Sequence, residues 1–178
     1  MPAICLIGMP GVGKSKIGHS MASLAGYDFI DTDLVINRQT GTSLNVTIDK
    51  IGADSFLEME DAALLGIHPS ETVIISPGGS SVFCDKGMAH IATFATILYL
   101  ADTLKNIERR IINLETRGIV GLTELGGLDA VYEQRDPLYR KWAHHVVWLP
   151  EGFPFNPSVK TMAERLVADY INGVVRHP

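Results

Sequence analysis

The stretch "IGMPGVGKSKIG", residues 7–18, decides the fold. Gly8, Gly13, Lys14 and Ser15 occupy the fixed positions of the pattern G-x-x-x-x-G-K-[ST]. Glycine lets the backbone turn its N–H groups inward without a clash from a Cβ atom. A loop of this kind wraps a phosphate group. The questions are therefore which molecule carries that phosphate and which molecule, if any, receives it.

The segments on either side of this loop supply the context that the pattern requires. "AICLIG" at residues 3–8 is a short apolar run and predicts a buried strand, while residues 14–25 carry apolar side chains at helical spacing. The start of that helix adds partial positive charge for an anion. Lys14 is expected to reach the β and γ phosphates, and Ser15 to bind Mg²⁺. We therefore predict that ATP or GTP binds here with Mg²⁺; a chance glycine turn is the alternative.

The rest of the chain alternates predicted strands with predicted helices. Strands are expected at residues 27–33, 71–79, 93–101 and 144–149. Helices are expected within 34–52 and at 54–67, 103–115, 128–143 and 159–175, with Pro137 either kinking its helix or starting a new one. This alternation predicts an α/β fold with a five-stranded parallel sheet flanked by helices in a three-layer sandwich, formed by residues 1–178 as a single domain.

Composition narrows the class of partner. The chain has 178 residues, 46% hydrophobic and 20% charged, which is typical of a globular protein. Its net charge of -5 argues against a nucleic-acid partner, and no window approaches the apolar length of a membrane span. The first residues do not resemble a secretory signal, and the two cysteines are not spaced as zinc ligands. We expect a cytoplasmic monomer with a small-molecule partner.

Two aspartates, Asp31 and Asp33, follow the second predicted strand. Ligands of open α/β sheets collect at the carboxyl ends of the strands, where these carboxylates lie. One carboxylate beside a metal ion and one beside an acceptor hydroxyl group is an arrangement that phosphoryl transfer uses. The alternative is that Asp33 only caps the helix that follows.

Taken together, these segments make the chain resemble the shikimate kinases, small P-loop kinases with the fold of the nucleoside-monophosphate kinases. The resemblance covers nearly the whole length. It rests on several motifs in a fixed order, namely "GMPGVGKSKIG", "DTD" at 31–33, "GADSFLEMED" at 52–61, "PGG" at 77–79, "ERR" at 108–110, "TRG" at 116–118, "RDPLY" at 135–139 and "NP" at 156–157. Many nucleotide-hydrolysing proteins share the first motif, whereas the order of the others is far more specific.

For the nucleotide, the resemblance implies ATP bound with Mg²⁺. The residues that it assigns to ATP are Gly11, Val12, Gly13, Lys14, Ser15, Lys16, Arg110, Asn156 and Pro157. Arg110 would lie against the adenine, with Asn156 and Pro157 on its other side. Ser15 would hold the metal ion directly, and Asp31 would support it through water. A helix position such as that of Arg110 is otherwise simply exposed to solvent.

For the acceptor, the resemblance implies a small alcohol bound beside helices at residues 34–67, under a lid at residues 116–127. Asp33 would contact the substrate hydroxyl groups and act as the base. The backbone N–H groups of Gly78 and Gly79 would face the substrate, and Arg135 would bind its carboxylate. With Lys14, Arg117 on the lid would neutralise the transferring phosphoryl group. The alternative for Arg135 is a surface ion pair with Glu133 or Asp136.

The chain departs from the family pattern in the motif that binds the acid. The family has an arginine after the phenylalanine of "GADSF", and this arginine and the counterpart of Arg135 together bind the carboxylate of shikimate. Leu57 stands at that place, although Glu60 is kept, and the family's third glycine is Ser80. One hydrogen bond to a charged group contributes about 1.5–3 kcal/mol, roughly 10- to 150-fold in binding. Leu57 provides no such bond, and Glu58 after it would repel an anion if it faced the pocket.

The sequence thus predicts an ATP-dependent kinase that phosphorylates a hydroxyl group of a small molecule. Shikimate is the leading acceptor, with shikimate 3-phosphate and ADP as products. Two alternatives stay open: a kinase of a different, less anionic alcohol, and a nucleotide-binding module without catalytic activity. The retained Lys14, Ser15, Asp31, Asp33 and Arg117 argue against the module, because chemistry needs these groups and binding alone does not.

Overall fold

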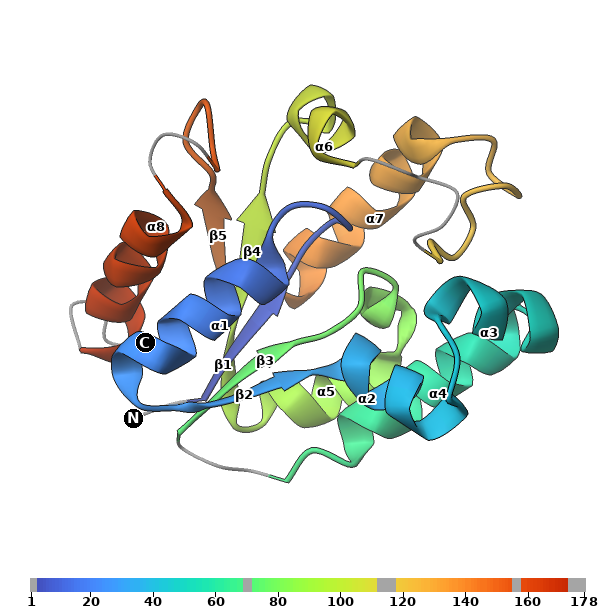
Figure 1. Ribbon diagram of the computed structural model, residues 1–178, viewed down its shortest axis with the longest axis horizontal. Helices are drawn as coiled ribbons and strands as arrows, with labels where there is room; N and C mark the ends of the chain where they lie inside the picture. Colours follow the sequence, from blue (N-terminus) through green and yellow to red (C-terminus); the bar gives the residue numbers. More distant parts are fainter. Residues whose placement is uncertain (1–2, 69–71, 112–117, 155–157, 173–178) are drawn as a thin grey trace.

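The computed structural model describes residues 3–68, 72–111, 118–154 and 158–172 (Figure 1). Its centre is a sheet of five parallel strands in the order β2-β3-β1-β4-β5. The strands are β1 (Ala3–Ile7), β2 (Asp28–Asp31), β3 (Val73–Ser76), β4 (Ala95–Ala101) and β5 (His145–Trp148). This sheet confirms the predicted fold class, and each strand lies within or next to its predicted segment.

Helices cover both faces of this sheet. They are α1 (Lys14–Ala25), α2 (Thr32–Thr40), α3 (Leu44–Ile51), α4 (Ala53–Leu65), α5 (Asp85–Ala92), α6 (Leu104–Arg110), α7 (Leu128–Trp142) and α8 (Val159–Leu166), with a short 3₁₀ turn η1 (Ser81–Phe83) and a π-helical turn η3 (Val167–Ile171). Figure 1 shows α1 and α8 on one side of the sheet and α5 and α7 on the other. Within the described residues, no helix is long and apolar enough to span a membrane.

Two apolar cores, one on each face, fix the three layers. Strand β1 lies between β3 and β4, and all five of its side chains are buried, because a parallel sheet is covered on both faces. Its alternate residues Ile4 and Leu6 pack with Ile17 of α1 in one core. Cys5 and Ile7 join the other core, whose buried residues also come from α4, α5, α6 and α7. The loop after Ile7 therefore leaves the middle of the sheet at its carboxyl edge.

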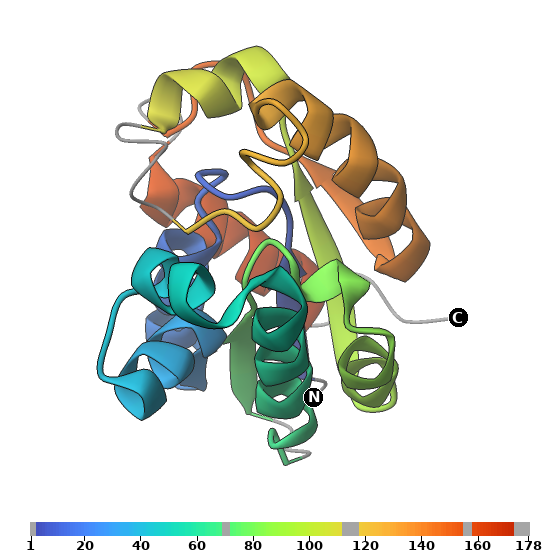
Figure 2. The ribbon, with the colours of Figure 1, turned by 90° about the vertical axis from the view of Figure 1, so that its right-hand side faces the viewer.

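A third, small core holds helices α2, α3 and α4 beside that edge. It consists of buried Ile36, Phe56 and Val120, with Leu44 and Ile48 packed against it. Val120 belongs to the segment 118–127, which leads from a contact with α3 to the start of α7 (Figure 2). This core packs the three helices against the segment 118–127. The segment therefore covers the carboxyl edge of the sheet.

Two features of the helices differ from the sequence prediction. Helix α5 was not predicted, because Gly87 interrupts its pattern; a Cβ atom at Gly87 would lie 2.7 Å from Cβ of Leu64, so glycine permits the close packing of α4 against α5. Helix α7 runs unbroken through Pro137. Pro137 and Glu133 one turn before it are both exposed, so the carbonyl group that loses its helical partner faces water.

Candidate active site

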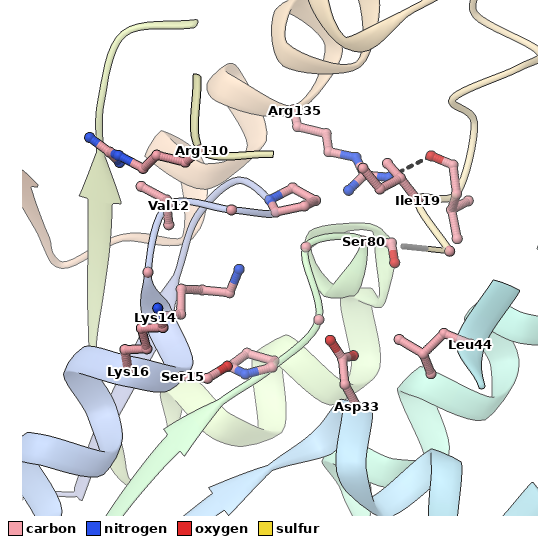
Figure 3. Close-up of a pocket in the computed structure, with 18 of the residues that line it drawn as sticks. Val12, Lys14, Ser15, Lys16, Asp33, Leu44, Ser80, Arg110, Ile119 and Arg135 are labelled. Carbon is pink, nitrogen blue, oxygen red and sulfur yellow. Dashed lines mark hydrogen bonds between the residues drawn. The ribbon is translucent and has the colours of Figure 1, made fainter. Parts of the chain in front are cut away.

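A cavity of about 540 Å³ opens at the carboxyl edge of the sheet, a volume typical of small-molecule sites (Figure 3). Its lining joins segments that are far apart in the chain. They are the loop 10–13 and the first turn of α1, Asp33 of α2, Leu44 of α3, Phe56 and Glu60 of α4, residues 77–80 after β3, Arg109 and Arg110 of α6, residues 118–120, Arg135 of α7, and Phe153, Pro154 and Val159 near the C-terminal end.

The phosphate-binding loop, residues 8–15, has the backbone that its glycines permit. Gly8 has φ +147° and Gly13 has φ +110°, values that side chains rarely adopt. A Cβ atom at Gly8 would also lie 2.7 Å from the carbonyl oxygen of Leu100. Gly13 is the N-cap of α1 and supplies no side-chain cap, so the first N–H groups of this helix are left for another partner.

Lys14 carries the positive charge of this loop. Its side chain is 8% exposed, and Nζ donates to the carbonyl oxygens of Gly8 at 2.8 Å and Met9 at 3.2 Å. Burial lowers the pKa of Lys14 to about 8, while the charges of Asp33 and Asp31 act in the opposite direction. Ser15 and Lys16 follow on the exposed side of the same turn and also line the cavity.

The two aspartates after β2 have different partners. Asp31 is the N-cap of α2, and its Oδ1 accepts from the backbone N–H groups of Asp33 at 3.1 Å and Leu34 at 3.4 Å. The helix cap is thus Asp31 and not Asp33. Asp33 lines the cavity and projects toward its interior opposite Lys14 (Figure 3). Burial raises the pKa of Asp33 to about 6, and Lys14 opposes this shift.

Gly78 and Gly79 form a backbone wall between the two halves of the cavity. The N–H group of Gly78 donates to Oγ1 of Thr32 at 3.2 Å, and a Cβ atom at Gly78 would lie 2.7 Å from Oδ1 of Asp33. A Cβ atom at Gly79 would lie 2.8 Å from Pro10 of the phosphate-binding loop. The Pro10 ring leaves no room for a side chain at position 79, and a side chain at position 78 would displace the carboxyl groups of Asp33 and Glu60, so the sequence pattern at 77–79 reflects crowding around the site.

Arg135 is buried and belongs to the cavity. Its side chain is 1% exposed, and Nη2 donates to the carbonyl oxygen of Val120 at 2.6 Å. Its Nε has no hydrogen-bond partner within the described part of the chain. The surface pairing considered from the sequence is wrong, because Asp136 pairs with Arg140 and Glu133 is exposed. Arg135 therefore places a guanidinium group with an unpartnered Nε–H in the wall of the cavity.

Arg110 lies at the opposite end of the cavity, beside the phosphate-binding loop. It forms an ion pair with Asp102, and its Nε donates to the carbonyl oxygen of Phe153 at 3.2 Å. Its guanidinium group lies 5.3 Å from the ring centroid of Phe153, and that ring would contact a Cβ atom at Gly13 at 3.3 Å. Sequence reasoning missed Asp102 and Phe153, although Asp102 directly follows β4 at the carboxyl edge.

Glu60 and Ser80 form a buried pair that sequence reasoning also missed as part of the site. Glu60 is 2% exposed, and its Oε2 accepts the hydroxyl hydrogen bond of Ser80. Burial raises the pKa of Glu60 to about 7. Leu57 is not one of the cavity-lining residues of the described chain and packs against the larger core, while Glu58 is exposed.

Three predicted site residues, Arg117, Asn156 and Pro157, lie outside the described residues. No cluster of three His, Cys, Asp or Glu side chains suited to a metal ion exists within the described segments. Mg²⁺ commonly needs only one or two protein oxygen atoms beside nucleotide phosphates and water. The hydroxyl group of Ser15 and the carboxylate of Asp31, near Lys14, are oxygen ligands of the required kind.

Several known proteins have amino-acid sequences similar to that of this chain. The family model for shikimate kinase matches residues 10–151. The chain is 32% identical to a shikimate kinase of Paracidovorax citrulli, covering 92% of this chain and 91% of that protein. It is 31% identical to a shikimate kinase of Nitrosomonas europaea, covering 81% of this chain and 69% of that protein.

Solved structures share the fold. A shikimate kinase from Acinetobacter baumannii in complex with shikimate superposes with a TM-score of 0.84 at 22% identity, covering 99% of this chain and 96% of that one. A gluconokinase from Sinorhizobium meliloti superposes with a TM-score of 0.52 at 16% identity, covering 97% of each chain. The architecture is thus common to kinases with different acceptors.

Proposed function

The chain belongs to the shikimate kinase family, a family of ATP-dependent kinases, and we propose that it transfers the γ-phosphoryl group of ATP to the 3-hydroxyl group of shikimate. The products are ADP and shikimate 3-phosphate. The observation that carries this proposal is the shared cavity. It brings the phosphate-binding loop with Lys14, the carboxylate of Asp33 and the guanidinium group of Arg135, whose Nε is unpartnered in the described chain, around one space.

Asp33 is the proposed base. The hydroxyl oxygen of the acceptor forms a bond to the γ-phosphorus while the bond from that phosphorus to the β–γ bridging oxygen breaks. The hydroxyl proton passes to the carboxylate of Asp33, and ADP leaves. The raised pKa of Asp33 makes this carboxylate a stronger base than an ordinary aspartate. Lys14 and Arg117 would offset the negative charge on the transferring group.

The nucleotide would lie along the phosphate-binding loop, from Lys16 to the pair of Arg110 and Asp102. The backbone N–H groups of Gly11, Val12 and Gly13 and the start of α1 suit an anion. Nζ of Lys14 would exchange its two backbone carbonyl partners for phosphate oxygens. Mg²⁺ held by Ser15, with Asp31 behind it, would neutralise charge on the phosphates. Arg110, Asn156 and Pro157 would flank the adenine.

The acceptor would lie between Asp33 and Arg135. Nε of Arg135, buried without a partner in the described chain, is the donor best suited to its carboxylate. The N–H group of Gly79 would face its hydroxyl groups, while that of Gly78 would have to leave Oγ1 of Thr32 to do so. Helices within residues 34–67 would form the floor of this subsite. Residues 116–127 would act as the lid, and the bond from Arg135 to Val120 would hold it down.

A second candidate acceptor is a less anionic alcohol. The observation that favours it is the loss of the arginine at position 57, which leaves Arg135 as the single arginine among the described residues beside Gly79 and Val120.

The monomeric state, the cytoplasmic location and the single domain predicted from the sequence stay predictions.

The test is a coupled assay of ADP release with Mg·ATP, with and without shikimate. We expect shikimate-dependent release by the native protein. Asp33→Asn should lower kcat by about 10²- to 10⁴-fold and leave ATP affinity near the native value, because the acceptor proton loses its base. Release that does not depend on shikimate, or that Asp33→Asn leaves intact, would contradict the proposal. A screen of neutral polyols in the same assay tests the second candidate.

A further inference from the structure

Asp102 is buried directly after β4, and both of its carboxylate oxygens are engaged. The residue is 2% exposed. Oδ1 accepts from the backbone N–H group of Thr103 at 2.7 Å and from Nδ2 of Asn106 at 2.8 Å, while Oδ2 forms the ion pair with Nη2 of Arg110. The start of α6 thus fixes the carboxylate, and the carboxylate fixes the arginine at the other end of the same helix.

Phe153 also holds Arg110 in place. Nε of Arg110 donates to the carbonyl oxygen of Phe153, and the guanidinium carbon lies 5.3 Å from the centroid of the Phe153 ring. The remaining nitrogen, Nη1, is buried and has no hydrogen-bond partner among the residues that the structure describes. Buried polar groups are nearly always paired, and Arg110 lines the cavity. The acceptor that Nη1 lacks therefore suits an atom of a ligand.

Phe153 links this arginine to the phosphate-binding loop. Phe153 is 5% exposed, and its ring lies 3.3 Å from a Cβ atom built at Gly13, the N-cap of α1. The loop and the guanidinium group of Arg110 thus lie against the same ring. An aromatic ring beside a planar cation suits a planar aromatic base. A nucleotide with its phosphates on the loop would therefore carry its base toward Arg110.

The ion pair of Arg110 with Asp102 has more effect on binding than on the stability of the fold. The removal of two charges from water costs about as much as their attraction returns, so a buried ion pair is often no more stabilising than apolar side chains. An arginine side chain has many rotamers, and a site that leaves it free must order it when the ligand binds. Asp102 orders Arg110 before the nucleotide arrives.

We propose that Asp102 is a positioning residue for the nucleotide, because it holds Arg110 in the orientation in which Nη1 donates a hydrogen bond to an acceptor atom of the base. Asp102 is not one of the cavity-lining residues of the described chain, so it acts through Arg110. This inference rests on the proposed function and deepens it. It assigns part of the affinity for ATP to a carboxylate outside the sequence motifs of the site.

A double-mutant cycle measured by calorimetry tests this proposal. ADP and ribose 5-diphosphate, which has the same phosphates and sugar but no base, are titrated with Mg²⁺ into the native protein, Asp102→Asn, Arg110→Met and the double variant. Asp102→Asn should weaken ADP binding by about 10-fold and leave binding of ribose 5-diphosphate unchanged, because only the contact with the base is lost. Added to Arg110→Met, it should weaken ADP binding no further. In the coupled assay, Asp102→Asn should raise KM for ATP by a similar factor and leave kcat near the native value.

The outcomes separate this inference from the proposed function. Equal losses for both ligands in Asp102→Asn, an unchanged ADP affinity, or a further loss in the Arg110→Met background would overturn the role of Asp102 and leave the proposed function standing. Failure of the native protein to bind ADP would overturn both.

Two other variants complete the test. Asp169→Asn removes a surface ion pair with Arg165 and is the control that should change neither affinity. Asn106→Ala removes one of the donors that fix the carboxylate of Asp102, and it should weaken ADP binding alone by about 2- to 3-fold. This second variant keeps the proposal testable even where Asp102→Asn does not fold, and an unchanged ADP affinity in it would then count against the role of Asp102.

Discussion

The phenol hydroxyl group of Tyr139 donates a 2.6 Å hydrogen bond to the carbonyl oxygen of Gly79. Tyr139 and Arg135 lie one turn apart on α7, so this helix presents both side chains to the same wall of the cavity. The ring of Tyr139 stacks on Tyr99 at 5.0 Å between centroids, and Tyr99 donates to Asp136 at 2.7 Å. A packed aromatic pair thus fixes the backbone that faces the proposed acceptor.

Removal of this bond is expected to affect the acceptor more than the nucleotide. Tyr139→Phe leaves the carbonyl group of Gly79 without its partner, which costs about 1–3 kcal/mol of unfolding free energy. We expect KM for shikimate to rise by about 3- to 10-fold with KM for ATP unchanged. Tyr132→Phe is the matched control on the same helix, because Tyr132 donates to Asp102 beside Arg110. Equal changes in both KM values for Tyr139→Phe would contradict this role.

Arg135 is expected to dominate binding of the acid group. Arg135→Met removes a buried guanidinium group, and since a charged hydrogen bond contributes about 1.5–3 kcal/mol, KM for shikimate should rise by about 10- to 150-fold. ATP binding, measured by calorimetry, should stay near the native value. Arg140→Met, at an exposed position on the same helix, serves as the control and should change neither parameter. An unchanged KM for shikimate in Arg135→Met would place the acid group elsewhere.

Restoring the arginine of the family pattern is expected to strengthen acid recognition. Position 57 is three residues before Glu60 on α4, so a long arginine side chain there is expected to lie next to this carboxyl group in the wall of the cavity. Leu57→Arg should lower KM for shikimate by about 10-fold, because the acid group gains a second charged donor. Leu57→Met preserves volume and should leave this KM unchanged. A higher KM for Leu57→Arg in a protein of native melting temperature would count against this assignment.

Glu60 is expected to make the folded state less stable as the pH rises. Lys14, Asp33, Ser80 and Arg135 surround it, and burial raises its pKa from 4.5 to about 7. The folded state then keeps a proton that the unfolded state releases between these values, so unfolding free energy falls with increasing pH in that window, by about 3 kcal/mol for this group.

Urea unfolding at pH 5 and pH 8 measures this loss. Glu60→Gln does not titrate, and we expect its loss of unfolding free energy between the two values to be smaller than that of the native protein. Glu58→Gln lies at an exposed position of the same helix and should behave like the native protein. Identical pH dependence in Glu60→Gln and the native protein would show that Glu60 releases its proton alike in both states.

The fold was predictable because its signals are local. The apolar run before Gly8 and the helical spacing after Gly13 identify the strand, loop and helix directly, and the alternation along the chain identifies a parallel sheet. Helix α5 was not predicted, because a glycine usually weakens a helix. In the structure, Gly87 allows the close contact of α5 with Leu64. Of the two alternatives for Pro137, a new helix is wrong, because solvent exposure of the neighbouring backbone lets α7 continue.

The site was predictable only where a motif carries its chemistry. Lys14, Ser15 and Asp33 follow from patterns of spacing, and the structure brings them to one cavity. Glu60 and Ser80 are 20 residues apart, and their pairing depends on how α4 packs against the loop after β3. Burial of Arg135 likewise depends on the fold, because its sequence neighbours Glu133 and Asp136 suggested a surface ion pair.

The central claim is that this chain phosphorylates shikimate, and identification of the product tests it most directly. The native protein is mixed with Mg·ATP and shikimate, and the products are followed by ³¹P NMR. The account predicts loss of the γ-phosphate signal of ATP together with one new phosphomonoester signal that couples to the ring proton at carbon 3 of shikimate. Persistence of ATP, or its conversion to ADP and inorganic phosphate without a phosphomonoester, would contradict it.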